Sequence, residues 1–164
     1  MNALCPGCGL ELPSSGKPLD SRYNSSTECW MLFGELSAYT LSHGDRRFIH
    51  QHAVDAWQLQ HAVITKSNIG IAFSLIGLYL ALDKGYTGRQ VQLAHMELGR
   101  TKRHWGDFTI PWTRAAFTVR DVVDVRPGPA RDAKLMEWAR SVWDNWPHAH
   151  AWTRETCARL LRDF

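Results

Sequence analysis

Apolar residues recur every three to four positions along most of the chain, the spacing that gathers them on one face of an α-helix. The first stripe runs from Cys29 to Thr40 and follows Ser25-Ser26-Thr27, residue types that favour the start of a helix. Similar patterns predict a bundle of about six helices at about residues 25–42, 46–63, 67–83, 88–102, 119–123 and 130–162, the last interrupted at Pro147. No strand, hairpin or repeat pattern competes, so we expect an all-α fold.

The order of these segments indicates how they pack. The helix expected at 67–83 is apolar nearly all round, which is typical of the centre of a bundle. The short link His43-Gly44-Asp45 predicts that the helices on either side of it lie antiparallel. Residues 1–24 have turn residues and no helical period, so we expect a lid on a helical bundle at 25–164, the two forming a single domain over 1–164.

Tryptophan is unusually frequent, with eight residues in a chain of 164. Such an aromatic load fits a core of large side chains, and it also fits an aromatic pocket or a groove for a partner. Residues 103–117, with Trp105, Phe108 and Trp112, have no clear period and are expected to form an ordered loop that could wall a pocket.

The charge balance does not demand an anionic partner. The formal net charge is +3 and the basic residues are dispersed, so nucleic acid is not indicated. The most apolar stretch, residues 69–82, is too short to span a membrane, and the N-terminus lacks a secretory pattern, so we expect a cytoplasmic protein. Nucleic-acid binding remains the least favoured alternative, through Arg46, Arg47, Arg100, Lys102 and Arg103.

The most informative motif is Cys5-Pro6-Gly7-Cys8-Gly9, a turn in which two thiolates can hold one tetrahedral metal ion. Zinc is the ion that most often uses this arrangement. A redox pair is the alternative, but such pairs stand at the N-terminus of a helix after a strand, and no strand is expected before residue 5. The motif therefore favours a metal site.

The other ligands are inferred from the helix arrangement. If the chain reverses near residue 44, Cys29 lies level with about residue 59 and so close to His61. His50 is eleven residues from His61, roughly 16 Å along a helix, so the two cannot hold one ion. We predict a structural zinc site of Cys5, Cys8, Cys29 and His61. Buried non-ligand roles remain open for Cys29 and His61, and Cys157 is expected in the core.

Four segments of the chain form a combined pattern: the Cys-Pro-Gly-Cys-Gly start, the pair Cys29-Trp30, the block Val54–His61 and the segment Trp138–Trp143. In this pattern the chain resembles an uncharacterised bacterial family of unknown function over most of its length. Trp57 stands where the family has tyrosine, and residues 147–150 match a family pair of histidines imperfectly. The matched positions are Cys5, Cys8, Cys29, His50, Asp55, Gln60, His61 and His150.

After the metal site is filled, His50, Asp55 and His150 remain as catalytic candidates, since a carboxylate can orient a histidine that acts as a base or metal ligand. His50 and Asp55 fall on different faces of one helix, so separate structural roles are the alternative. The leading hypothesis is a zinc-stabilised binding or accessory module for an unidentified small molecule or protein. The second is a metal-dependent enzyme with an open site among His50, His61 and His150.

Overall fold

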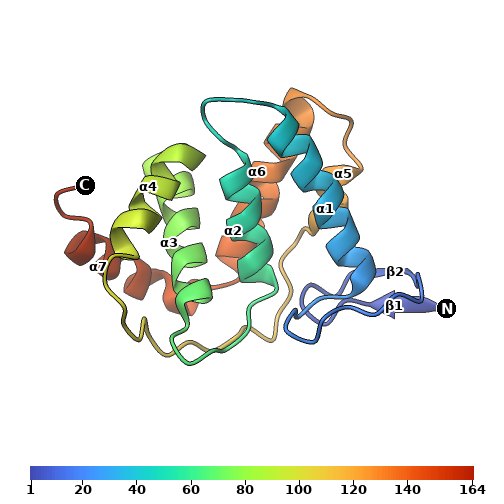
Figure 1. Cartoon of the computed structure of the whole chain (residues 1–164), viewed down its shortest axis with the longest axis horizontal. Coiled ribbons are helices and arrows are strands. Elements are labelled where there is room, and N and C mark those ends of the chain that lie inside the picture. The colour runs from blue at the N-terminus through green and yellow to red at the C-terminus, as the bar shows by residue number, and fades with distance from the viewer.

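The computed structural model describes residues 1–164 and confirms a helical fold with a cysteine-rich lid. The helices are α1 (Thr27–Ser42), α2 (His50–Gln60), α3 (Ile69–Lys84), α4 (Gly88–Leu98), α5 (Val119–Val123), α6 (Pro129–Asp144) and α7 (His150–Leu160), with a 3-10 turn at Pro147–Ala149. α3 packs against α2, α4, α6 and α7, as expected for the central helix (Figure 1). None of these helices combines the length and hydropathy that a membrane crossing needs.

The lid contains a small hairpin that the sequence pattern did not predict. β1 (Asn2–Leu4) pairs antiparallel with β2 (Glu11–Pro13), so that Ala3 lies opposite Leu12. Each strand has three residues, too few for an alternating pattern to appear. The cysteine turn forms the connection between the two strands, and the hairpin therefore fixes the start and the end of that turn.

The link between α1 and α2 is longer than expected, and α2 begins at His50 rather than near Arg46. Asp45 accepts a hydrogen bond from the backbone N–H of Phe48, and Phe48 adopts a left-handed conformation with φ +56°. A left-handed residue cannot continue an α-helix, which explains the later start. α4 also ends early, at Leu98 rather than near Lys102.

Most tryptophans lie in the core, which supports the structural interpretation of their abundance. Trp138, Trp143 and Trp146 are almost fully buried and belong to one continuous apolar cluster that also includes Cys5 and Cys8. Trp112 is the exception, since 93% of its surface is exposed on the loop between α4 and α5. The cysteine turn is thus part of the same core as the helices.

Candidate metal centre

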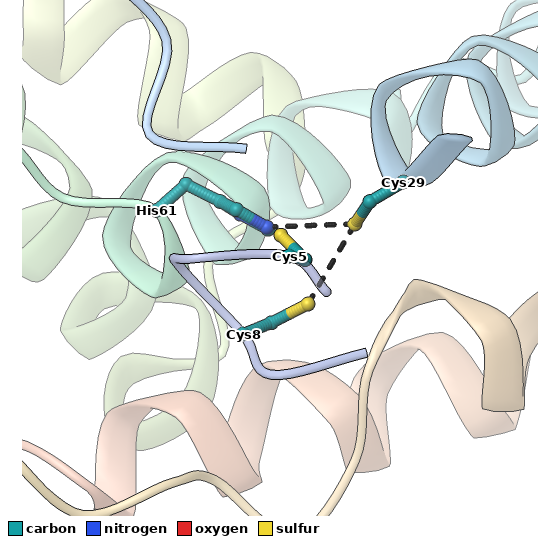
Figure 2. Close-up of side chains that lie close together, drawn as sticks. All are labelled: Cys5, Cys8, Cys29 and His61. Carbon is teal, nitrogen blue, oxygen red and sulfur yellow. Dashed lines mark hydrogen bonds between the residues drawn. The ribbon is translucent and has the colours of Figure 1, made fainter. Parts of the chain in front are cut away.

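Four potential metal ligands meet where the lid touches α1 and α2. The Sγ atoms of Cys5, Cys8 and Cys29 and a ring nitrogen of His61 all lie within 4.8 Å of one another, and all four residues are buried (Figure 2). Cys8 Sγ and Cys29 Sγ are 3.6 Å apart, and Cys29 Sγ is 3.6 Å from His61 Nε2. Two ligands of one tetrahedral zinc ion would be separated by about 3.6–3.8 Å, given bonds of about 2.3 Å to sulfur and 2.0–2.1 Å to nitrogen. The two distances match such a site.

The turn that carries Cys5 and Cys8 is closed by its own backbone. The N–H of Cys5 donates to the carbonyl of Leu10 at 2.8 Å, and the N–H of Gly9 donates to the carbonyl of Cys5 at 2.9 Å. Gly9 has φ +79°, a left-handed conformation that glycine adopts without a steric penalty. The N–H groups of Cys8 and Leu10 also approach the sulfurs of Cys5 and Cys8, an arrangement that stabilises thiolates.

Cys29 is placed by the start of α1. The side chain of Ser26 accepts a hydrogen bond from the N–H of Cys29 at 3.1 Å and so caps the helix. Cys29 therefore stands in the first helical turn with its side chain fully buried, as expected from the sequence. The neighbouring residue Ser25 lies 3.8 Å from Cys5 Sγ through its hydroxyl and joins the start of the helix to the cysteine turn.

His61 caps the C-terminal end of α2 and is fixed in one orientation. Its Nδ1 lies 2.8 Å from the carbonyl of Trp57, so Nδ1 carries the proton and donates it. The imidazole also stacks on the Trp57 ring, with 3.6 Å between centroids and 23° between planes. Nε2 is then the nitrogen with a free lone pair, and it is the nitrogen that lies against Cys29 Sγ.

A further contact fixes the cysteine turn against the rest of the protein. Gly7 lies so close to Asn24 and His61 that a Cβ atom there would overlap the Asn24 carbonyl and the imidazole. On the outer side, the Arg114 guanidinium donates to the carbonyls of Pro6 and Gly7. Arg114 belongs to the loop between α4 and α5, so three segments distant in sequence hold this turn.

The electrostatics of the cluster favour a bound cation. Hydrogen bonds to Cys5 and Cys8, together with burial, raise the pKa of the Cys29 thiol well above its ordinary value. Three buried sulfurs therefore do not all ionise on their own, whereas a divalent cation among them would compensate the charge of the thiolates. Cys157 is buried away from the cluster, and burial raises the pKa of its thiol to about 12.

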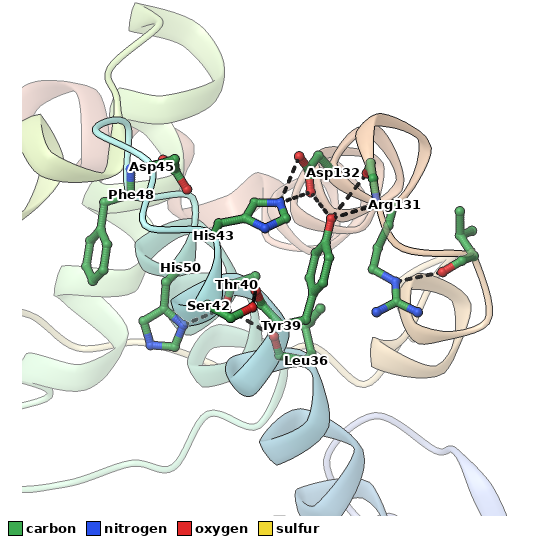
Figure 3. Close-up of polar contacts among 12 residues, drawn as sticks. Leu36, Tyr39, Thr40, Ser42, His43, Asp45, Phe48, His50, Arg131 and Asp132 are labelled. Atoms are coloured by element: carbon green, nitrogen blue, oxygen red, sulfur yellow. Dashed lines mark hydrogen bonds and ion pairs between the residues drawn. The ribbon is translucent and has the colours of Figure 1, made fainter.

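The remaining histidine candidates do not join this cluster or one another. His50, at the start of α2, has Nδ1 2.8 Å from the hydroxyl of Thr40, and burial lowers its pKa (Figure 3). His150, at the start of α7, has Nε2 2.9 Å from the carbonyl of Trp143 and stacks on that ring at 3.8 Å. The open site of His50, His61 and His150 is therefore not assembled, because each histidine has separate partners.

Asp55 and Gln60, the other matched positions, lie on α2, where Asp55 is buried and Gln60 is half-buried. Asp55 accepts one hydrogen bond from Gln51 through Oδ1, while Oδ2 has no partner and burial raises its pKa well above the ordinary value. Gln60 accepts from Trp138 Nε1 at 2.9 Å and donates to the carbonyl of Phe117 at 2.8 Å. Gln60 thus connects α2 with α6 and the segment before α5.

A second polar cluster was missed in the sequence because its members are about ninety residues apart. The Tyr39 hydroxyl donates to Asp132 Oδ1 at 2.7 Å, and His43 Nε2 lies 3.3 Å from both oxygens of Asp132 (Figure 3). Tyr39 lies in the last turn of α1 and His43 caps the end of that helix, four residues later, but no local pattern points to Asp132 on α6.

Fold and site together define a helical protein with a buried cluster of three cysteines and one histidine that could hold a metal ion. The chain belongs to a family of unknown function (DUF5946), whose model matches residues 3–147. This agrees with the resemblance to an uncharacterised family noted in the sequence. No curated protein and no solved structure matches the chain.

Proposed function

We propose that this chain is a single zinc-stabilised domain that acts as a binding or accessory module rather than through metal catalysis. The observation that carries the proposal is the group of four buried ligand atoms, all within 4.8 Å of one another. A reducing cytoplasm fits the proposal, because the three ligand thiols must stay reduced to bind metal.

Zinc is the proposed ion because of the donor set. Three thiolates and one imidazole are soft and borderline ligands that suit zinc, and their separation fits a tetrahedron. The imidazole is held by a carbonyl on its other nitrogen, which is the usual second contact of a zinc-bound histidine. The donor chemistry and the supporting contacts thus agree.

A structural role is proposed because four protein ligands complete the coordination of zinc. Catalytic zinc sites usually have three protein ligands and leave one position for water or substrate. Here the ligands come from the lid, the first turn of α1 and the end of α2, so one ion would join all three segments. The alternative, an open catalytic metal site, would need His50, His61 and His150 to lie together, and these three histidines do not form such a group.

Elemental analysis combined with native mass spectrometry tests the proposal. The wild-type chain and a Cys157→Ser control, which changes a buried thiol outside the cluster, should each carry one zinc ion. Cys8→Ser should lose the ion, and the lid should become sensitive to protease while the control stays resistant. Zinc-free wild-type protein with a protected lid, or equal zinc content in Cys8→Ser, would contradict the proposal.

A further inference from the structure

A cavity of about 580 Å³ lies apart from the metal centre, where the α1–α2 loop, α2, the α3–α4 link and α6 meet. Its apolar wall includes Ile49, Tyr86 and Met136. Its polar wall includes His43, Asp45, His52 and Asp132, two carboxylates and two imidazoles from three separate elements. A mainly apolar cavity with a few convergent polar groups is the usual form of a small-molecule site.

The polar wall offers mostly hydrogen-bond acceptors. Asp132 is oriented by the Tyr39 hydroxyl at 2.7 Å and by His43 Nε2 at 3.3 Å, which leaves lone pairs on its carboxylate for a further donor (Figure 3). Asp45 uses Oδ1 to accept from the N–H of Phe48, which leaves Oδ2 for another donor. Both carboxylates are therefore positioned by the protein and remain able to accept.

His52 contributes a buried imidazole to the same wall. Only 6% of the residue is exposed, yet its Nδ1 has no hydrogen-bond partner. Burial lowers the pKa of His52 to about 4, against a smaller opposing effect of Asp45, so the ring is neutral at pH 7. Nδ1 itself is covered by protein atoms and does not face the cavity, so it is not a contact for a ligand. The neutral ring adds no positive charge that would oppose a cation at this wall.

The loop that carries His43 and Asp45 is held rigidly. Phe48 is in the left-handed region at φ +56°, a strained conformation for a large side chain that persists only when its surroundings fix it. The backbone of Gly88 packs directly on the carbonyl of Phe48, with no room for a Cβ atom. The Arg89 guanidinium lies 3.9 Å from the centre of the Phe48 ring, and the backbone N–H of Arg89 donates to the carbonyl of Arg47 at 3.2 Å. The wall is thus preorganised.

We propose that this cavity binds a small organic amine in its protonated form. The ammonium N–H groups donate to Asp45 and Asp132, and the hydrocarbon part lies on Ile49 and Met136. Two carboxylates face one cation, Arg47, so the wall has a formal charge of −1 when both imidazoles are neutral, which favours a cationic ligand over an anion. The site does not include any of the four metal ligands.

Titration calorimetry with 2-phenylethylamine and with the diamine 1,4-diaminobutane tests the proposal, and 2-phenylethanol serves as the uncharged match of the first probe. We expect saturable one-site binding of at least one amine, with 2-phenylethanol at least about tenfold weaker than its amine. Asp132→Asn and Asp45→Asn should each weaken amine binding at least about tenfold. Asp144→Asn, the same change at an exposed position on α6, should not.

Histidine NMR on the wild-type protein keeps the test independent of variant folding. Amine addition should shift the ring resonances of His43 and His52 and leave those of the exposed His104 unchanged. Absence of saturable binding for both amines up to about 10 mM, equal binding of amine and alcohol, or shifts at His104 alone would overturn the proposal. Zinc content measured on the same samples separates this outcome from failure of the metal proposal.

Discussion

Gly7→Ala changes the metal centre without removing a ligand. The new Cβ atom would overlap the Asn24 carbonyl and the imidazole edge of His61, and would lie 3.0 Å from His61 Cγ. Carbon atoms in contact prefer about 3.5–4.0 Å, so the ring or the turn must move by roughly 0.5–1 Å to clear Cγ and by more than about 1 Å to clear the nearer Cδ2. Metal–ligand distances tolerate only about 0.2 Å, so Nε2 cannot keep its place in the cluster after such a shift.

The expected cost follows from these distances. Overpacking of a well-packed site costs about 1–3 kcal/mol, and for a chain of this size each kcal/mol lowers Tm by about 2–4 °C. We therefore expect Tm to fall by about 2–12 °C. Disturbance of a ligand through its surroundings lowers metal affinity by about 10–100-fold, which competition with a chromophoric zinc chelator measures.

Gly34→Ala is the matched control, because a Cβ atom at this position on α1 meets nothing within 4 Å. Replacement of glycine by alanine inside a helix stabilises by about 0.5–1 kcal/mol, so this variant should melt slightly higher with unchanged zinc affinity. A Gly7→Ala variant that retains the wild-type Tm and zinc affinity would refute the predicted overlap, and so would a change of both variants in the same direction.

Three further predictions concern residues outside the cluster. The raised pKa of Asp55 means that the folded state binds its proton more tightly than the unfolded state, so its contribution to stability is lost as pH rises above about 4. Asp55→Asn should flatten this dependence and stabilise the protein at neutral pH, as measured by urea unfolding across pH; an unchanged pH profile would argue against a buried proton. Gln60→Leu leaves the Trp138 N–H without its acceptor and should cost about 1–3 kcal/mol in urea unfolding at unchanged zinc content. His50→Ala and His150→Ala should each retain one zinc per chain by elemental analysis. Loss of zinc in either variant would instead support a metal site that includes these histidines.

The sequence was sufficient for the helices and for the proximity of the four candidate ligands. Strong periodicity located α1 and α3 within about two residues, and the antiparallel arrangement expected for the first two helices correctly predicted that His61 lies near Cys29. The helix positions and the proximity of His61 to Cys29 both follow from local periodicity and from a short link between helices, and these features can be recognised in a single sequence. The spacing of Cys5 and Cys8 in one turn was enough to predict that these two side chains lie close together.

The parts that the sequence did not reveal depend on long-range contacts or local strain. A strand of three residues is too short to show an alternation of apolar and polar residues, so the hairpin in the lid could not be predicted from the sequence. The left-handed Phe48 is held by packing on Gly88, forty residues later, so the longer α1–α2 loop had no local signal. The pairing of His43 with Asp132 likewise arises only when α6 packs beside the end of α1.

The position of the four ligands along the chain also bears on biosynthesis. All of them precede α3, which begins at Ile69, so the proposed zinc ion would be captured while the ribosome is still making the rest of the molecule. A nascent chain stabilised in this way would expose its thiols to oxidants only briefly. Zinc supply during translation should then govern the yield of folded protein more strongly than zinc added after purification.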